Sequence, residues 1–252
     1  MEKILNEIVK FFNYGIFFYS SLLILSYLAI IFLSIKAMVH YVRKNSFVDY
    51  RVILSSPLAP SISLIAPAYN EGLTIIENVR SLLSLHYGDF EVIVVNDGSK
   101  DDSLQKLINY FQLVPVNFSY DEKIKTKLVK HVFKSTDAAF SKLVVVDKLN
   151  GGKADALNVG INISRGRIFA CIDVDCILEQ DALLKMAKPF LEETETRVIA
   201  TGGVVRIANS CEIEDGKIIK VHLPKDFLPR IQVLEYLRAF SARMGWSSIN
   251  GL

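Results

Sequence analysis

The stretch Phe90-Glu91-Val92-Ile93-Val94-Val95-Asn96-Asp97-Gly98-Ser99 decides the fold. A run of strand-forming apolar residues ends there in polar and turn-forming residues, as a buried strand does when it enters a loop. Comparable runs occur at 61–66, 143–146 and 167–172. Helical patterns lie between these runs, so the sequence predicts an α/β fold with a mostly parallel sheet covered by helices on both faces.

The spacing of apolar residues predicts helices over 71–85, 101–111, 154–164, 179–190 and 228–244. Residues 114–142 interrupt the alternation and carry a basic stretch of Lys123, Lys125, Lys127, Lys130 and Lys134. We interpret this stretch as a solvated strand and loop.

Polar residues directly follow three of the predicted strands. They are Pro67-Ala68-Tyr69-Asn70-Glu71, then Asn96-Asp97-Gly98-Ser99, then Asp173-Val174-Asp175. A single Asp after a strand is ordinarily a helix cap, but ligands of open α/β sheets bind outside the carboxyl ends of the strands. Three polar clusters at one edge therefore predict a binding site there.

Asp173 and Asp175 are spaced so that both carboxylates can face one hard cation. Mg²⁺ or Mn²⁺ accepts one or two protein carboxylates and completes its shell with water and phosphate oxygens. A cation held in this way neutralises a departing diphosphate. The alternative is that the two carboxylates cap the helix predicted over 179–190.

The segment 148–158 combines a Gly151-Gly152 turn, the cation of Lys153 and the start of a helix. Backbone N–H groups of such a turn can closely approach a phosphate or a nucleotide ring. It is not a P-loop, because Ala154 follows Gly152-Lys153 where that motif has Ser or Thr.

The four motifs at 67–71, 95–99, 151–158 and 173–175, in this order, resemble the family 2 glycosyltransferases of GT-A fold. The similar branch is that of the processive membrane enzymes, which includes the poly-β-1,6-N-acetylglucosamine, cellulose, chitin and hyaluronan synthases. The resemblance runs from about residue 60 to the end of the chain.

The resemblance implies a role for each motif residue. Pro67, Tyr69 and Glu71 correspond to the first nucleotide-contacting loop, Asp97 to the carboxylate that recognises the uridine, and Lys153 to the basic residue beside the nucleotide. Asp173 and Asp175 correspond to the DxD motif, which holds the diphosphate through Mg²⁺ or Mn²⁺.

The implied function is that of an inverting glycosyltransferase in a membrane. It would transfer a sugar, N-acetylglucosamine by resemblance, from a UDP-sugar to a growing β-linked polysaccharide. Its partners would be the UDP-sugar, the polysaccharide acceptor and the lipid bilayer. Two alternatives are a sugar nucleotidyltransferase, which needs a Gly-rich phosphate loop after the first strand, and a catalytically inactive, membrane-tethered nucleotide-binding scaffold.

One departure from the family pattern concerns the catalytic base. Such enzymes carry an acidic Glu-Asp motif that supplies the base, followed by a Gln-x-x-Arg-Trp motif, which the context of Trp246 does not fit. We therefore expect a fragment whose acceptor part is incomplete and whose base lies beyond residue 252. Neither Asp181 nor Asp226 is assigned that role, so no catalytic residue is identified.

The segment 11–35 contains no charged residue and is long enough to cross the ~30 Å hydrocarbon layer as one helix. It predicts a chain made of a flank over 1–10, a transmembrane helix over 11–35, a linker over 36–60 and an incomplete GT-A domain over 61–252. The basic residues after the span are Lys36, Arg43, Lys44 and Arg51. The positive-inside rule then predicts a cell-membrane protein with a cytoplasmic catalytic domain.

Composition limits the remaining possibilities. Lysine and arginine number 29 against 27 acidic residues, so no basic field favours nucleic acid as a partner. Cys171, Cys176 and Cys211 show no spacing typical of a disulfide framework or a zinc site, which fits a reducing compartment. The helix predicted over 228–244 either lies on an anionic membrane surface or packs on the domain core.

Overall fold

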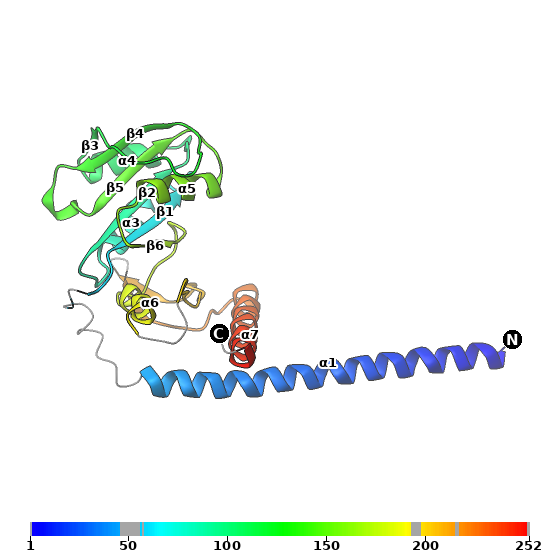
Figure 1. Ribbon diagram of the computed structural model, residues 1–252. Helices are drawn as coiled ribbons and strands as arrows, with labels where there is room; N and C mark the ends of the chain where they lie inside the picture. Colours follow the sequence, from blue (N-terminus) through cyan, green and yellow to red (C-terminus); the bar gives the residue numbers. More distant parts are fainter. Residues whose placement is uncertain (1, 46–55, 57, 193–197, 215–216, 251–252) are drawn as a thin grey trace. The chain divides into compact units, whose positions relative to one another are not determined.

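The computed structural model describes residues 2–45, 56, 58–192, 198–214 and 217–250. The chain divides into two compact units, which we describe separately. One unit comprises residues 1–48, 204–210 and 223–252, and the other comprises 49–203 and 211–222. All predicted site residues belong to the second unit, whose strands and helices are labelled in Figure 1.

A mixed six-stranded sheet forms the centre of the second unit, with the strand order β3-β4-β5-β2-β1-β6. The neighbours β5, β2, β1 and β6 are parallel, whereas β4 pairs antiparallel with both β5 and β3. The mostly parallel arrangement predicted from the sequence is therefore confirmed. The strands are β1 (Ile62–Ala68), β2 (Phe90–Asn96), β3 (Leu113–Val116), β4 (Val129–Ser135), β5 (Leu143–Lys148) and β6 (Ile168–Cys171).

Helices cover both faces of this sheet, as predicted. They are α3 (Ile75–Leu83), α4 (Ser103–Tyr110), α5 (Lys153–Ile163) and α6 (Ala182–Leu191), with a 3-10 turn η1 (Ala138–Phe140). Helices α3, α4 and α6 contribute to one buried cluster, and α5 contributes to the other. A small hairpin of β7 (Glu212–Glu214) and β8 (Lys217–Lys220) completes the unit.

Side chains of β2 and β5 alternate between the two faces because successive residues of a strand point to opposite sides. Ile93, Val95, Val144 and Val146 lie on the face that α5 covers. Gly160 lets α5 approach this face closely, since a Cβ at that position would overlap the side chain of Ile65. The two strands run in register, so their polar carboxyl ends lie side by side.

Two predicted helices begin later than expected. The helix predicted from residue 71 starts at Ile75, because Asn70 adopts a left-handed conformation and residues 72–74 form a turn. The helix predicted from residue 179 starts at Ala182. The basic stretch forms a loop and strand β4, and four of its five lysines are exposed, as predicted for a solvated segment.

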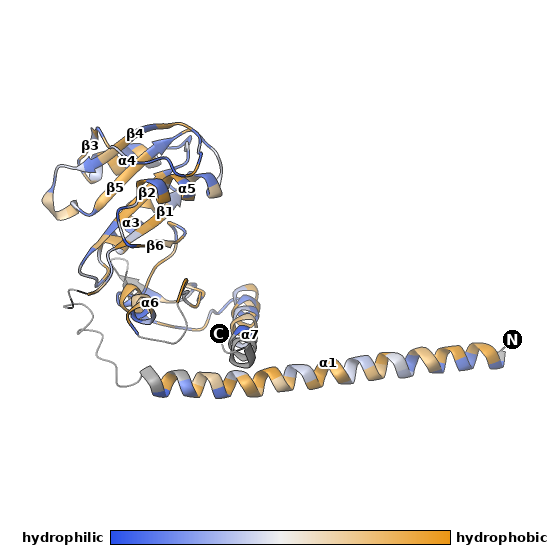
Figure 2. Cartoon of the chain, in the orientation of Figure 1, coloured by the Kyte–Doolittle hydropathy of each residue, from blue (hydrophilic) through white to orange (hydrophobic). Residues whose placement is uncertain are grey.

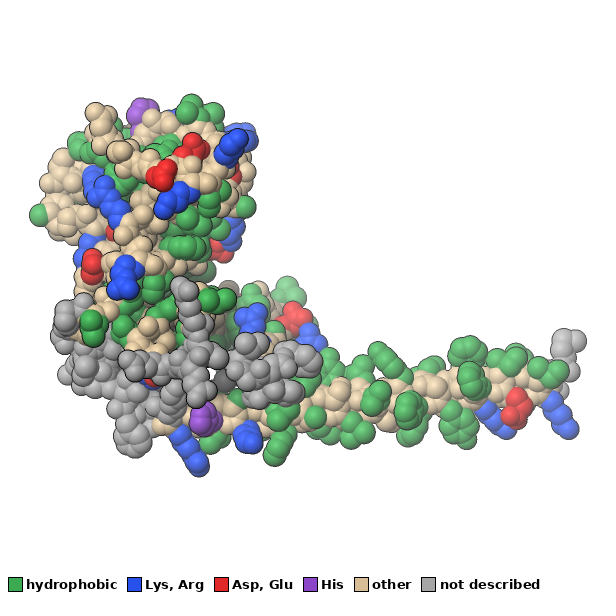
Figure 3. All heavy atoms as spheres, in the orientation of Figure 1, with side chains coloured by type: hydrophobic (Ala, Val, Ile, Leu, Met, Phe, Trp, Pro, Cys, Tyr) green, Lys and Arg blue, Asp and Glu red, His purple; other side chains and the backbone are tan. Residues whose placement is uncertain are grey.

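In the first unit, α1 (Glu2–Asn45) is a single helix that continues past the uncharged segment 11–35 at both ends. Residues 36–45 of the expected linker are thus helical, whereas residues 46–55 and 57 lie outside the described residues. Within the described chain, α1 is the one helix long and apolar enough to cross a membrane, and almost none of it is buried. Hydrophobic residues predominate along it (Figure 2), and the space-filling view shows hydrophobic side chains over most of its length, with charged side chains near its ends (Figure 3).

Helix α7 (Phe227–Asn250) matches the helix predicted over 228–244 and contacts α1. The Ser34 hydroxyl of α1 donates a hydrogen bond to the Ser241 carbonyl of α7. Leu234 and Leu237 of α7 remain exposed.

Candidate functional site

The first polar loop is fastened to the loop after β2. The Asn70 N–H donates to the Ser99 hydroxyl at 3.0 Å, and the Lys100 N–H donates to the Asn70 side-chain oxygen at 2.8 Å. The Glu71 N–H donates to the Ser103 hydroxyl at 2.9 Å. The two loops therefore form one polar edge, as expected for neighbouring parallel strands.

Tyr69 and Pro67 occupy different positions on this edge. The Tyr69 side chain is 45% exposed, so its ring is available to a ligand, whereas Pro67 lies within β1 and is partly buried. An open hollow of about 570 Å³ lies beside the same loop. Its described lining includes Asn70, Gly72 and Lys100, but neither Tyr69 nor Pro67.

Asp97 is almost fully buried, and its carboxylate accepts hydrogen bonds from this chain. Lys148 Nζ donates at 2.7 Å, the Gly151 N–H at 2.9 Å and the Gly152 N–H at 2.7 Å. Asn150 adds a hydrogen bond to the Asp97 backbone carbonyl at 2.8 Å. In this structure Asp97 therefore organises the Gly-Gly turn that precedes α5.

Lys148 and Asp155 are two site residues that the sequence analysis did not single out. Lys148 is completely buried, and its Nζ lies 2.7 Å from carboxylate oxygens of both Asp97 and Asp155. A signal for it was available: Lys148 continues the alternation of Val144 and Val146, which are buried against α5. A lysine at such a position must find partners, because an unpaired buried charge is strongly unfavourable.

Lys153, the first residue of α5, forms an ion pair with Asp173 in the loop after β6. The hydrogen bond to Asp173, together with the charges of Asp173 and Asp175, raises the pKa of Lys153. Unlike Lys148, both members of this pair are exposed, with side-chain exposures of 63% and 50%. The predicted Lys153 and DxD residues thus meet at the edge of the sheet.

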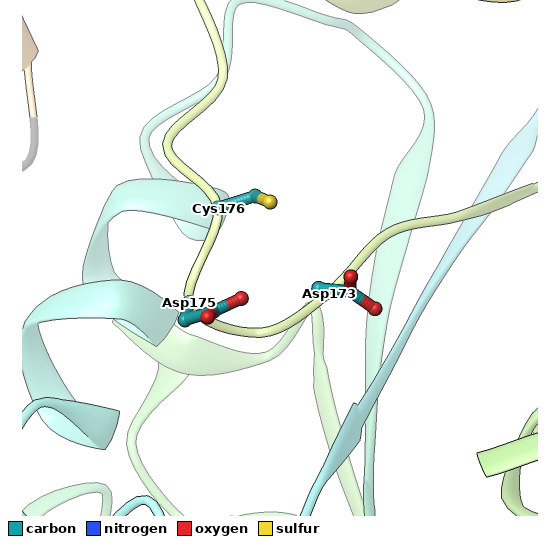
Figure 4. A group of neighbouring side chains, drawn as sticks. All are labelled: Asp173, Asp175 and Cys176. Atoms are coloured by element: carbon teal, nitrogen blue, oxygen red, sulfur yellow. The ribbon is translucent and has the colours of Figure 1, made fainter. Parts of the chain in front are cut away.

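Asp173, Asp175 and Cys176 offer three potential ligand atoms that lie within 4.8 Å of one another. Figure 4 shows these side chains on one short stretch of the loop after β6. Cys176 was not among the predicted site residues, although it directly follows Asp175.

Glu71 lies within electrostatic range of this cluster. Partial burial and the nearby charges of Asp175 and Asp101 raise its pKa. The first polar loop and the loop after β6 therefore approach each other, as expected for loops that follow the neighbouring parallel strands β1 and β6.

The capping alternative for Asp173 and Asp175 is wrong. Helix α6 begins at Ala182, and the residue at its N-cap is Asp181. Asp173 and Asp175 lie well before the helix and face the edge of the sheet with Lys153. Their carboxylates are not used to satisfy the N-terminus of α6.

The chemistry of the cluster fits a hard divalent cation. Carboxylate oxygens are the ligands preferred by Mg²⁺ and Mn²⁺, and one or two of them suffice when phosphate oxygens complete the shell. The Lys153 ammonium pairs with Asp173, so these carboxylates attract positive charge, and a metal ion would compete with Lys153 for Asp173. A bound cation would supply electrostatic stabilisation of a phosphate leaving group.

A comparison with known proteins identifies the family. The family model described as Glycosyl transferase family 2 matches residues 63–135 and 127–237. A poly-beta-1,6-N-acetyl-D-glucosamine synthase of Staphylococcus epidermidis is 30% identical over 175 residues, which are 69% of this chain and 32% of that protein. The chain thus spans about a third of the length of the curated relatives it matches.

Two solved structures show weaker similarity. The first is S. aureus TarS 1–349 in complex with UDP-GlcNAc, which has 24% identity, a TM-score of 0.37, and coverage of 52% of this chain and 31% of that chain. The second is the mannosyltransferase PcManGT from Pyrobaculum calidifontis in complex with GDP-Man and Mn²⁺, with 20% identity, a TM-score of 0.41, and coverage of 66% and 44%.

The family match covers the sheet and all four motifs, and it confirms the resemblance predicted from the sequence. The chain belongs to glycosyl transferase family 2.

Proposed function

We propose that this chain carries the donor-binding part of an inverting, membrane-bound glycosyltransferase. The enzyme would transfer N-acetylglucosamine from a UDP-sugar to a growing β-linked polysaccharide. Family membership supports glycosyl transfer, and the name of the Staphylococcus epidermidis relative supports the choice of sugar and polymer.

The observation that carries this proposal is the meeting of Lys153 with Asp173 and Asp175 at the carboxyl edge of the sheet. A UDP-sugar brings a diphosphate that must be neutralised as it leaves. We assign Asp173 and Asp175 to a bound Mg²⁺ or Mn²⁺, and Lys153 to the diphosphate once the cation takes Asp173. Both steps need accessible side chains, and those of Lys153 and Asp173 are at least half exposed.

We assign the nucleotide to the adjoining edge. The exposed ring of Tyr69 offers a stacking surface for the base. Glu71 lies in the same loop, which is hydrogen-bonded to the loop after β2, and Pro67 lies in β1 just before this loop. Asp97 contributes to nucleotide recognition in this proposal while it also holds the Gly151–Gly152 turn.

Inversion by direct displacement also requires a base that removes the proton of the acceptor hydroxyl. We assign that role to no residue of this chain. The proposal for the chain itself is therefore donor binding, and transfer to the polysaccharide is a proposal for the whole enzyme.

We also propose that α1 crosses the cell membrane and that the second unit is cytoplasmic. The helix passes through the uncharged segment 11–35, and the basic residues Lys36 and Arg43 follow this segment. Reporter fusions after residue 60 and at the N-terminus give the test. A reporter active only outside the cytoplasm should be silent when fused after residue 60, and activity there would contradict this orientation.

Isothermal titration of the purified chain with UDP-GlcNAc, UDP-glucose and UDP tests donor binding. We expect binding that needs Mn²⁺ or Mg²⁺ and that favours UDP-GlcNAc over UDP-glucose. Asp175→Asn should raise the Mn²⁺ or Mg²⁺ concentration that donor binding requires, whereas the matched control Asp181→Asn removes a charge before α6 and should leave that concentration unchanged. Equal affinity with and without metal would contradict the proposed site.

Of the two alternative functions, the nucleotidyltransferase is excluded and the inactive scaffold is left to experiment. A nucleotidyltransferase is not retained, because the chain belongs to a glycosyltransferase family and lacks a Gly-rich loop directly after β1. Metal-dependent UDP-GlcNAc binding without transfer by the whole protein, given an oligosaccharide acceptor, would instead support the inactive scaffold.

A further inference from the structure

We propose that Lys148 is a positioning residue of the donor site. Through Asp97 it fixes the Gly151–Gly152 turn, and the turn places Lys153 against Asp173. The part of this inference that concerns donor binding rests on the proposed function. The part that concerns the turn rests on contacts alone.

The Lys148 ammonium is completely buried and has a full set of acceptors. Its Nζ lies 2.7 Å from Asp97 Oδ1, 2.7 Å from Asp155 Oδ1 and 2.6 Å from the Leu149 carbonyl oxygen. An ammonium has three donors, so each donor has a partner here. A neutral side chain at this position would leave two carboxylates facing each other without a cation.

The Gly151–Gly152 turn is built directly on these carboxylates. Both glycine N–H groups donate to Asp97, and Gly152 has a φ of 87°, which side chains other than glycine rarely adopt. A Cβ at Gly151 would overlap the Asp155 carboxylate. The turn therefore keeps its shape only while Asp97 and Asp155 stay in place, and Lys148 is the cation that holds them together.

The Gly151–Gly152 turn also sets the position of Lys153. Lys153 directly follows Gly152 and begins α5, and its ammonium forms the ion pair with Asp173. A shift of the turn moves the Lys153 backbone, whereas Asp173 belongs to a different loop and stays behind. Lys148 thus acts on the donor site without being exposed to it.

A purely structural role for Lys148 makes a different prediction. In that case its loss would lower the unfolding temperature, but the folded fraction would bind nucleotide normally. A positioning role predicts a folded protein with a loosened turn and weakened binding. The two roles separate when the turn, the binding and the stability are measured on the same variants.

The experiment compares Lys148→Met with the matched control Lys142→Met. Lys142 precedes the opposite end of β5, where its Nζ lies 4.0 Å from the centre of the Phe90 ring and 3.3 Å from the Gly88 carbonyl. Both variants lose one partly or fully buried lysine from the same strand region. Hydrogen exchange of the peptide 149–153 reports on the turn, and titration with UDP and Mn²⁺ reports on binding.

We expect Lys148→Met to accelerate exchange in 149–153 and to weaken UDP binding about 10- to 100-fold, the range found when the outer-shell partners of metal ligands are removed. Lys142→Met should change neither. Unchanged exchange in 149–153 in Lys148→Met would overturn the inference. If the wild-type chain binds UDP, an unchanged UDP affinity of Lys148→Met would overturn it as well.

Failure of the proposed function would look different. If the wild-type chain binds no UDP but Lys148→Met still accelerates exchange in 149–153, the positioning of the turn is supported and donor binding is refuted. A double variant covers the case in which Lys148→Met unfolds. Adding Asp155→Asn removes one of the two unpaired carboxylates and should restore folding, but it should restore neither the exchange protection nor the UDP affinity.

Discussion

Two lysines on either side of the Gly151–Gly152 turn form ion pairs with aspartates, and these two sets of contacts differ in burial. Lys148 is fully buried between Asp97 and Asp155, whereas Lys153 and Asp173 are at least half exposed. In the buried set, the side chains of Lys148 and Asp97 are 0% and 5% exposed, and that of Asp155 is 21% exposed. In the exposed pair, water and ligands can reach both charges.

This difference indicates a division of labour. The charges of a buried ion pair stay together, because separating them would leave each one unpaired in an interior of low polarity. An exposed pair contributes little to stability and separates easily. The buried set is therefore suited to fix the turn at 151–152, and the exposed pair is suited to release Asp173 to a metal ion. The predictions below test this contrast.

The largest expected effect is on stability in Lys148→Met. The variant leaves Asp97 and Asp155 without their cation, and breaking a buried pair costs about 3–5 kcal/mol. Urea unfolding followed by circular dichroism measures this loss. A loss below about 1 kcal/mol is the range of exposed ion pairs, and it would show that the ion pairs of Lys148 with Asp97 and Asp155 do not stabilise the fold.

The second effect is on metal affinity in Asp175→Asn. Removal of a carboxylate from the cluster with Asp173 and Cys176 should lower Mn²⁺ affinity about 10- to 100-fold. Because Asp175 is exposed, the free energy of unfolding should change by no more than about 0.5 kcal/mol. Paramagnetic relaxation of water protons gives the Mn²⁺ affinity. A large stability loss with unchanged affinity would reverse the assignment of this cluster.

The third effect is a change in acid sensitivity. Burial raises the pKa of Asp155, but hydrogen bonds from the Lys148 side chain and the Lys127 backbone outweigh it and hold the pKa below 3.8. A depressed carboxyl pKa adds stability above 3.8, and this stability is lost as the pH falls through the lower folded-state value. Unfolding free energies between pH 2 and pH 5 should therefore fall less steeply in Lys148→Met than in wild type. Equal slopes of unfolding free energy against pH in Lys148→Met and wild type would contradict this prediction.

The smallest effect is on stability in Lys153→Met. The pair with Asp173 is exposed, so its loss should cost less than about 1 kcal/mol. Donor binding should weaken nonetheless, because the cation beside the diphosphate is removed. Titration with UDP and Mn²⁺ measures donor binding, and urea unfolding measures the stability of the same variant. A stability loss as large as that of Lys148→Met would remove the distinction between the two pairs.

The sequence predicted the sheet and its site edge well because the signals there are local. Apolar runs such as 90–95 stand out from their polar neighbours, and parallel strands necessarily bring their carboxyl ends to one edge. The late starts of α3 and α6 were not predicted. The segments before these helices are held by hydrogen bonds between residues distant in sequence, from the Asn70 N–H to the Ser99 hydroxyl before α3 and from the His86 N–H to the Gln180 carbonyl before α6.

The role of Lys148 shows what the pattern leaves open. Two lysines, Lys148 and Lys153, flank the same Gly-Gly turn, and the resemblance to a family selected the second one only. Strand alternation could have placed Lys148 on the buried face with Val146. It could not have supplied the partners, because Asp97 belongs to another strand end and Asp155 to the first turn of α5.

The sequence by itself determined the α/β class, the polar motifs at the strand ends, the apolar segment near the N-terminus and the resemblance to a family of glycosyltransferases. These follow from local composition and from the two-residue and 3.6-residue periods of strands and helices. Tertiary structure alone decided which lysine meets which aspartate, and which of these pairs is buried. The physical reason is that ion pairing and desolvation depend on distances between residues that are brought together only when β2, β5 and α5 pack against one another.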